Sequence, residues 1–262
     1  MDKLMGKSAK PDRTIQSVVR AIQILEYVAA NKNLVKLTEL SKGLELSKST
    51  VYGLVSTLER LGYLQQTPEN GKYSLGLKLF ELGEIVHSSM DLRRIAIPYL
   101  HQLAAKYSET VHLAVLSRGV VVYIDKVDSD HSIRITSNVG GWNPAHCTGV
   151  GKVLLAGLTD VELESTVQEI NMKKFTPNTI TSMVQLKEII QNIRLQGYAL
   201  DNEEIEIGLT CVAAPVKNHK GKVVASISIS GPTNRMKDRL EQMRDEVIVA
   251  ARNISAELGC GP

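Results

Sequence analysis

Residues 36–75 read KLTELSKGLELSKSTVYGLVSTLERLGYLQQTPENGKYSL and predict a short helix, a tight turn, a second helix and a β-hairpin. Ser47 stands as the N-cap of the second helix. From Val51 to Leu61 the apolar residues recur at i, i+3, i+4, i+7 and i+10, which gives one core-facing stripe. Gly62 then ends the helix, and an Asn-Gly turn separates two short strands. This order of elements is typical of a winged helix-turn-helix, which places one helix in a DNA groove.

The face opposite the apolar stripe carries short polar and phenolic side chains near the N-terminus of the second helix. These groups can reach phosphate oxygens and base edges in the major groove, and a lysine in the hairpin adds a cation beside the phosphates. Helix-turn-helix shapes also serve as protein docking modules, so that interpretation stays open. The residues expected to contact DNA are Lys48, Ser49, Thr50, Tyr52 and Lys72.

The charge is unevenly distributed along the 262 residues, a length that suffices for two domains. Residues 1–75 carry eleven Lys and Arg against seven Asp and Glu, whereas residues 76–262 carry twenty against twenty-one. The basic excess therefore lies at the end expected to bind DNA. Because this excess is modest, we expect specific binding to need two copies on one DNA site.

The three cysteines, Cys147, Cys211 and Cys260, are too few and too widely spaced for a disulfide framework, and none forms a CxxC motif. We expect reduced thiols. No stretch approaches the ~18 unbroken apolar residues of a membrane span, and residues 1–11 have no apolar region typical of a signal peptide. The sequence therefore predicts a cytoplasmic protein.

The rest of the chain predicts an α+β architecture, because several antiparallel strands alternate with helices. We expect a polar arm over 1–13, a winged helix-turn-helix domain over 1–75, a connecting helix within 76–91 and a sensor domain over 92–262. The expected helices cover 17–31, 76–90, 92–107, 149–156, 159–170, 182–196 and 234–258, and the expected strands cover 111–116, 120–127, 131–136, 198–201, 209–217 and 223–230.

A seat for an anion is predicted in HCTGVGKVLLA, residues 146–156. Thr148 precedes a helix whose first free N–H groups belong to Gly149 and Val150, and such a helix start binds anions. A carboxylate fits this seat. The GVGK run is not a phosphate-binding P-loop, because His stands where the first Gly is required and Val replaces the Ser or Thr that holds magnesium.

Polar groups also gather in two later stretches. Asp201 stands at a strand end, and Cys211 lies on the next strand. In ASISISGP, Ser226, Ser228 and Ser230 alternate with isoleucines, so one face of that strand is all hydroxyl. An enclosed hydroxyl face requires hydrogen-bond partners or solvent. A single sheet bringing these stretches together would form a small-molecule site.

Each of these features also has a simpler interpretation. Asp201 with the acidic residues at 203–204 is typical of a solvated turn, Cys211 of an inert buried thiol, and a serine face of an exposed one. A metal site at His146 and Cys147 lacks a structural-zinc spacing. No sequence feature fixes the distance from Cys211 to His146, which a cysteine nucleophile with a histidine base requires. We therefore predict no catalytic residue, no metal and no cofactor, and a protein that is not an enzyme.

Over nearly its whole length the chain resembles the IclR family of bacterial transcriptional regulators. The resemblance rests on LSKSTVYGLVSTLERLGYL, PAHCTGVGKVLLA, GYALDNEEIEIGLTCVAAPV and SISISGPTNR. It implies a GAF-like effector-binding domain, a small organic acid as effector, and homodimers or homotetramers on a palindromic operator in double-stranded DNA. The effector contacts that it implies are Ile135, Gly149, Val150, Asp201, Cys211, Ser228 and Ser230.

One residue departs from the family pattern. Gly53 stands where family members often carry Arg in the recognition helix. The glycine removes a potential DNA contact and costs the helix roughly 0.5 to 1 kcal/mol relative to Ala. The expected fold is unaffected, whereas the preferred DNA sequence, and whether the protein represses or activates, stay open.

Overall fold

The computed structural model describes residues 14–88, 91–132, 135, 137–168 and 172–261. The chain divides into two compact units, Met1–Ser89 and Met90–Pro262. The predicted arm over 1–13 lies outside the described residues.

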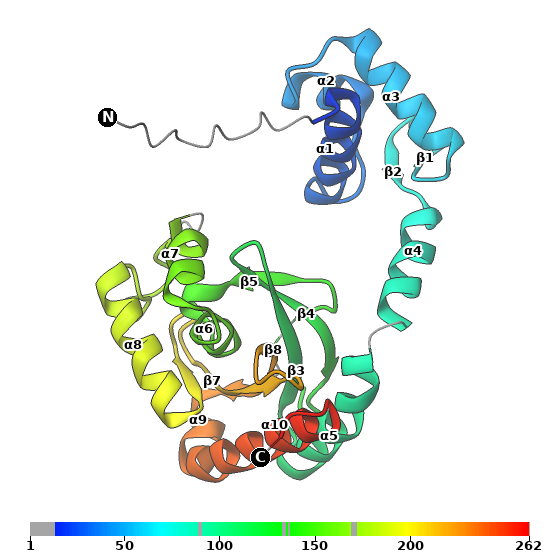
Figure 1. The fold of residues 1–262 in the computed structure, drawn as a ribbon. Helices are drawn as coiled ribbons and strands as arrows, with labels where there is room; N and C mark the ends of the chain where they lie inside the picture. Colours follow the sequence, from blue (N-terminus) through cyan, green and yellow to red (C-terminus); the bar gives the residue numbers. More distant parts are fainter. Residues whose placement is uncertain (1–13, 89–90, 133–134, 136, 169–171, 262) are drawn as a thin grey trace, which may run out of the picture. The chain divides into compact units, whose positions relative to one another are not determined.

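The first unit is a three-helix head with a two-stranded hairpin and a following helix (Figure 1). The predicted helices and strands are confirmed, with ends that differ by one or two residues. Its core is formed by one side of each head helix, with Ile24, Leu40 and Val51 fully buried. The elements are α1 Gln16–Ala30, α2 Leu37–Gly43, α3 Lys48–Arg60, β1 Leu64–Gln66, β2 Tyr73–Leu75 and α4 Leu77–Ser88.

Local signals set the ends of α3. The Ser47 hydroxyl accepts a hydrogen bond from the Thr50 N–H at 3.2 Å, which confirms the predicted N-cap. Gly62 adopts φ +79°, a left-handed conformation that ends the helix and that glycine adopts at little energetic cost. The hairpin loop spans 67–72, and Gly71 (φ +65°) closes it, so the Asn-Gly pair lies at the end of a six-residue loop.

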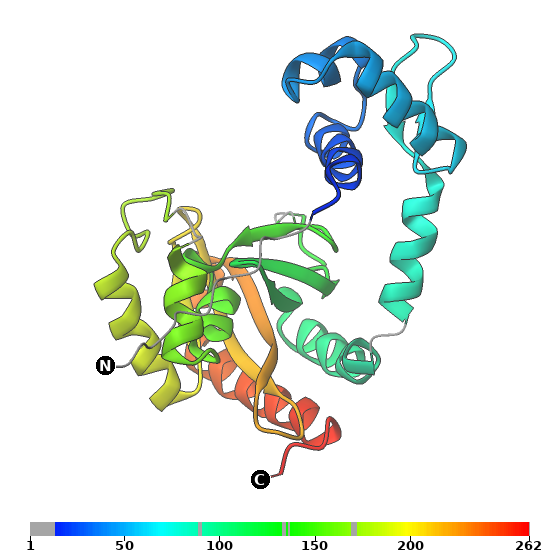
Figure 2. The ribbon, with the colours of Figure 1, turned by 45° about the horizontal axis from the view of Figure 1, so that its top comes forward.

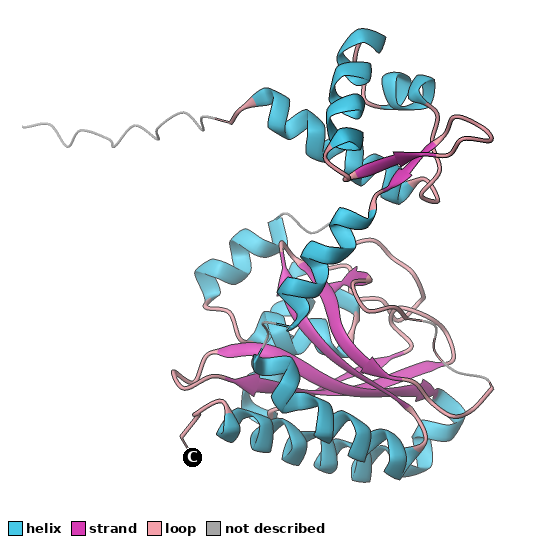
Figure 3. Ribbon diagram, turned by 90° about the vertical axis from the view of Figure 1, so that its right-hand side faces the viewer, coloured by secondary structure: helices cyan, strands magenta, loops and turns pink. Residues whose placement is uncertain are grey.

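The second unit is built on a six-stranded antiparallel sheet with strand order β5-β4-β3-β8-β7-β6. Helices cover both of its faces (Figures 1 and 3). The strands are β3 Thr110–Ser117, β4 Val120–Val127, β5 Trp142–Pro144, β6 Ala199–Asn202, β7 Leu209–Lys217 and β8 Val223–Pro232. The helices are α5 Asp91–Tyr107, α6 Gly149–Ala156, α7 Asp160–Gln168, α8 Met183–Gln196, α9 Thr233–Met236 and α10 Leu240–Glu257, with short 3-10 turns at Ala145–Cys147 and Lys237–Arg239.

Each face of the sheet has its own apolar core. On one face α5 and α10 pack against residues such as Leu113, Ile227 and Ile229. On the other face α6 packs against smaller residues such as Ala114 and Ala213, and α8 packs against α6. Small side chains on this second face leave room for polar groups between the sheet and α6.

Two predicted elements differ from the structure, and one strand was not predicted. Residues 131–132 form a bend and Ile135 lies in neither helix nor strand, while 133, 134 and 136 fall outside the described residues, so the strand expected over 131–136 is absent from the described part of that stretch. The edge strand β5 was not predicted, because three residues that include a proline show no alternation. The helix expected over 234–258 is divided into α9, a 3-10 turn and α10. Arg235 in α9 makes two hydrogen bonds to buried Glu109, at 2.6 and 2.7 Å, which fixes α9 separately against the sheet.

Candidate functional site

The serine face of β8 is buried against the α6 side of the sheet. Ser226, Ser228 and Ser230 are at most 6% exposed, so the simpler interpretation of a solvated serine face is wrong. In the register of the sheet, Ser228 lies opposite Ala213 of β7, and Ser230 lies opposite Cys211. The Ser226 hydroxyl donates to the Ala214 carbonyl at 3.1 Å. The Ser228 hydroxyl has no hydrogen-bond partner among the described residues, although the side chain is only 1% exposed.

The N-terminus of α6 approaches the same strands. Thr148 caps the helix as predicted, because its hydroxyl accepts the Gly151 N–H at 3.2 Å. At Gly149, an added Cβ would lie 3.1 Å from the Cys211 sulfur and 3.5 Å from the Ala213 Cβ. A side chain there would crowd β7, so glycine permits the close approach. The positive end of the helix dipole consequently faces the polar groups of β7.

Asp201 is the acidic group of this site. It lies on β6 directly opposite Cys211 and is 2% exposed. Its Oδ1 accepts the Glu204 N–H at 2.8 Å. Burial raises the pKa of the Asp201 carboxyl to about 7, and the nearby Glu204 charge adds to the rise. Asp201 therefore exchanges a proton near neutral pH.

The cysteines of this region are neutral thiols. Burial raises the pKa of Cys211 to about 11, and the nearby Asp201 charge adds to the rise. Burial likewise raises the pKa of Cys147 to about 12. A thiol that stays protonated at neutral pH is a weak nucleophile.

His146 does not serve Cys211 as a base in this structure. Its Nε2 lies 3.2 Å from the Lys173 carbonyl oxygen, and its Nδ1 has no hydrogen-bond partner in the described part of the chain. Among the described residues, no group of three or more His, Cys, Asp or Glu side chains is gathered closely enough to bind a metal ion.

A histidine and a tyrosine that the sequence reasoning missed complete the polar face. His112 of β3 pairs with Ser228 in the sheet register and is 3% exposed. Its Nε2 lies 2.8 Å from the Ser137 hydroxyl, and burial lowers its pKa to about 4, so the ring is neutral at physiological pH. The Tyr123 ring centroid lies 4.9 Å from that of His112, and the Tyr123 hydroxyl accepts the Asn143 amide at 3.1 Å. The only signal was that His112 alternates with Val111 and Leu113 and hence faces the opposite side.

A buried ion pair lies beside Asp201. Lys152 of α6 and Glu204 are 3% and 7% exposed, and the Lys152 ammonium donates to the Glu204 carboxylate. The solvated turn considered for Asp201 and residues 203–204 is therefore wrong for Asp201 and Glu204. The Thr179 hydroxyl further fixes this turn by donating to the Glu204 carbonyl at 2.6 Å. An unpaired buried charge is costly, so Lys152 and Glu204 hold α6 and the turn after β6 together.

A chain of polar contacts leads from this site to the start of α5. His112 contacts Ser137, whose carbonyl accepts a hydrogen bond from the Lys126 ammonium. The Lys126 N–H donates to Asp125 Oδ1 at 2.8 Å, and Asp125 Oδ2 lies 2.9 Å from Arg93 Nε. Arg93 lies in the first turn of α5, two residues after its start. These contacts join the polar face of the sheet to the helix that follows α4 in the sequence.

The remaining expected effector residues differ in what the structure shows. Val150 is 2% exposed in the first turn of α6 and packs in the core on that face. Ile135 is half-buried and lies outside the regular strands. Its role as an effector contact remains a prediction.

The expected DNA-contacting residues lie on α3 and in the hairpin loop. Lys48, Ser49 and Tyr52 are exposed, and Tyr52 is 62% exposed. Thr50 and Lys72 are half-buried. The Ser49 and Thr50 hydroxyls both lie within 2.9 Å of the Ser47 hydroxyl, so they contact the N-cap side chain of the helix that carries them.

Comparison with known proteins identifies both units. Residues 17–68 match the IclR helix-turn-helix domain, and residues 85–256 match the bacterial transcriptional regulator IclR C-terminal domain. The chain is 41% identical to the HTH-type transcriptional regulator XynR of Escherichia coli over 246 residues, covering 94% of this chain and 98% of XynR. It is also 41% identical to the regulator KdgR of Escherichia coli over 251 residues, covering 95% of each chain. The crystal structure of Thermotoga maritima IclR is similar over 94% of this chain and 100% of its own, with a TM-score of 0.72 and 34% identity. This chain belongs to the IclR family of bacterial transcriptional regulators.

Proposed function

We propose that this chain is a DNA-binding transcriptional regulator whose operator affinity is controlled by a small carboxylate. The carboxylate binds between the N-terminus of α6 and strands β6, β7 and β8. Residues 1–75 act as the DNA-binding domain, 76–91 as the connecting segment and 92–262 as the effector-binding domain. The observation that carries this proposal is the buried Ser228 hydroxyl, which has no hydrogen-bond partner among the described residues and lies opposite Ala213, beside the helix start.

The chemistry of the surrounding groups favours a carboxylate. The free N–H groups at Gly149 and Val150 belong to the positive end of α6 and attract an anion. Ser228 and Ser230 supply hydroxyl donors, and Asp201 donates a hydrogen bond when it carries its proton. A ligand seated here satisfies the Ser228 hydroxyl, which otherwise remains buried at an energetic cost.

The experiment is a panel of small carboxylic acids tested by thermal unfolding of the full chain. An acid at ~100 times its dissociation constant is expected to stabilise the protein by roughly 2.7 kcal/mol. Ser228→Ala should weaken this shift. Ser226→Ala is the matched control, because its hydroxyl lies on the same face but is already bonded to the Ala214 carbonyl. If no acid in the panel shifts the melting temperature, or if both variants respond like the parent, the carboxylate site is contradicted.

We further infer that the effector acts through the contacts from His112 to Arg93. A ligand against Ser228 or Ser230 changes the surroundings of His112, and Ser137, Lys126 and Asp125 carry the change to the first turn of α5. The ligand can change the affinity for DNA only if it binds more tightly to one of two arrangements of the protein that differ in their affinity for DNA.

The protein is proposed to bind DNA as a homodimer or homotetramer. The first unit exposes large apolar side chains, including Val18 (52%), Ile22 (50%) and Leu61 (55%), around an apolar groove of about 380 Å3. On α4, Leu77 (73%) and Phe80 (66%) are also exposed. Apolar surface of this extent is typical of interfaces, and a second copy of the same unit covers it while presenting a second α3 to a palindromic site.

No helix among the described residues is both long and apolar enough to span a bilayer.

A further inference from the structure

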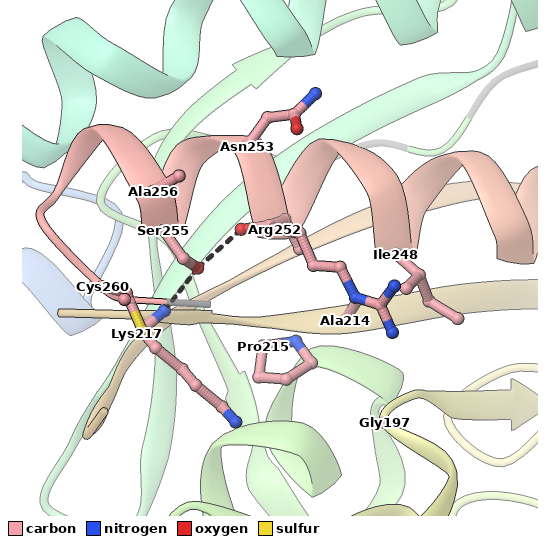
Figure 4. Close-up of a pocket in the computed structure, with 12 residues that line it drawn as sticks. Gly197, Ala214, Pro215, Lys217, Ile248, Arg252, Asn253, Ser255, Ala256 and Cys260 are labelled. Carbon is pink, nitrogen blue, oxygen red and sulfur yellow. Dashed lines mark hydrogen bonds between the residues drawn. The ribbon is translucent and has the colours of Figure 1, made fainter.

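A second groove, away from the α6 site, lies between α10 and the outer edge of β7 (Figure 4). Its volume is about 520 Å3, which is in the range of small-molecule sites, about 300 to 1,000 Å3. The β7–β8 hairpin runs along α10 and ends beside the turn after that helix (Figure 2). The groove lies at the open edge of the sheet and shares no residue with the proposed effector site.

The groove exists because the sheet edge is uncovered there. Strand β6 pairs with β7 only as far as Ala199 opposite Ala213, so residues 214–217 have no neighbouring strand on that side. Six of the twelve lining residues are Gly, Ala or Pro, and small side chains leave the space between helix and strand unfilled.

A docking β-strand does not suit this edge. Pro215 has no N–H to donate. The Lys217 N–H already donates to the Ser255 hydroxyl at 2.8 Å, and Ser255 in turn donates to the Ala251 carbonyl at 2.6 Å. Added strands bind through free backbone donors and acceptors, and these two positions offer no donor. A small molecule is therefore a better candidate than a β-strand to occupy the groove.

Two cations border the apolar floor of the groove. The side chains of Lys217 and Arg252 flank the Pro215 ring in Figure 4, and both residues are exposed. Within the described part of the chain, neither side chain takes part in an ion pair or a side-chain hydrogen bond. Pro215 and Ile248 supply apolar surface between and beside them. The groove thus combines uncompensated positive charge with an apolar floor.

We propose that this groove binds a small organic anion with an apolar body, such as an aromatic or medium-chain carboxylate or sulfonate. Arg252 and Lys217 hold the anionic group, and the body lies on Pro215 and Ile248. This inference does not depend on the proposed effector site, because the two sites share no residue.

The test uses 8-anilinonaphthalene-1-sulfonate as the probe and Cys260 as the reporter. Cys260 lines the groove and is half-buried, whereas Cys147 and Cys211 are buried, so iodoacetamide should modify Cys260 first. The rate of Cys260 alkylation in the full chain is followed by intact mass while the sulfonate is titrated. N-phenyl-1-naphthylamine, which lacks the sulfonate, serves as the neutral counterpart.

The sulfonate is expected to slow Cys260 alkylation in the parent protein. The double variant Arg252→Ala, Lys217→Ala should weaken this protection by roughly two- to thirtyfold in probe concentration, as for the loss of two exposed ion pairs. Ala256→Trp should block the groove from its exposed rim. The matched control Lys237→Ala removes an exposed cation elsewhere and should behave like the parent. Absence of protection, equal protection by the neutral probe, or protection that survives both groove variants would overturn the proposal.

Discussion

Asp201 gives the effector site a dependence on pH. Its folded-state pKa of about 7 lies above the ordinary value of 3.8, so the folded protein binds more protons than the unfolded chain between these values. The contribution of Asp201 to stability is therefore largest below about pH 4 and is lost as the pH rises through 7. The difference in melting temperature between Asp201→Asn and the parent protein should therefore be more positive at pH 8 than at pH 5. An equal shift at both pH values would contradict this.

His112 acts in the opposite direction and must be separated from Asp201. Its pKa is lowered to about 4, so stability from the neutral buried ring is complete above about pH 6.5 and is lost as the pH falls towards 4. Because His112 is present in both proteins, its contribution to stability cancels when Asp201→Asn is compared with the parent protein at the same pH. The same loss of the Asp201 proton should affect ligand binding. We expect the affinity of the parent protein for the carboxylate to decrease between pH 6 and pH 8, because Asp201 can then no longer donate a hydrogen bond to the ligand.

Gly53 weakens α3 without a structural requirement for glycine. An added Cβ would meet no atom within 4 Å, and the residue is exposed. Gly53→Ala is expected to increase the free energy of unfolding by about 0.5 to 1 kcal/mol, measured by urea denaturation. Gly62→Ala is the contrasting control and should destabilise, because Gly62 adopts φ +79°. Loss of stability in Gly53→Ala would contradict the open environment.

Lys48 and Tyr52 are expected to play different parts at the DNA surface. Lys48→Ala should weaken binding to operator and random duplexes alike, since a lysine near the helix start contacts phosphates. Tyr52→Ala should change the preference among sequences, because the exposed phenol is placed to reach base edges. Fluorescence anisotropy on both duplexes measures the two effects. Equal losses on both duplexes from both variants would reject this division of roles.

The elements that the sequence predicted best carry their own local signals. Ser47 and Thr148 are N-caps that bond within their own first turn, so they could be identified without knowing the rest of the fold. His112 and Glu204 could not, because their roles depend on partners distant in the sequence. Glu204 is buried by pairing with Lys152, 52 residues away. His112 joins the polar face only because β3 pairs with β8 more than a hundred residues later.

Strand β4 and helix α5 meet at the Asp125–Arg93 ion pair, where the proposed effector response can be interrupted. Asp125→Asn keeps the side-chain shape but removes the charge that holds Arg93 at 2.9 Å. We expect this variant to bind the effector and DNA nearly normally, yet to show a smaller change of DNA affinity on adding effector. Lys187→Ala is the control, because it breaks an exposed ion pair with Glu164 outside the route. An undiminished effector response in Asp125→Asn would contradict the route.

Assembly of the whole molecule is expected to depend on the exposed apolar surface of the first unit. Ile22→Glu and Phe80→Glu each place a charge in this surface, at side chains that are 50% and 66% exposed and not needed by the core of one copy. We expect a lower molecular mass by light scattering after gel filtration, with the melting temperature of each unit retained. Val249→Glu, at a 51% exposed position on α10, is the matched control. An unchanged mass in both variants would place the interface elsewhere.

The charge of the molecule also favours a paired DNA complex. Residues 1–75 carry an excess of four positive charges, whereas the rest of the chain is nearly neutral. Few phosphate contacts from one copy make non-specific binding weak, and two copies on one site double the number of contacts. Binding of two copies to one site should therefore weaken with salt about twice as steeply as binding of one copy.

One measurement tests sequence-specific DNA binding and effector control together. Fluorescence anisotropy measures binding of the full chain to its own upstream intergenic DNA and to a random duplex, each with and without a stabilising carboxylate. We predict roughly 10³-fold or greater preference for the upstream DNA at physiological salt. The carboxylate should change that affinity in the parent and in Ser226→Ala but much less in Ser228→Ala. Equal binding to both duplexes across a salt series, or an affinity that no stabilising acid alters, would contradict a ligand-controlled regulator.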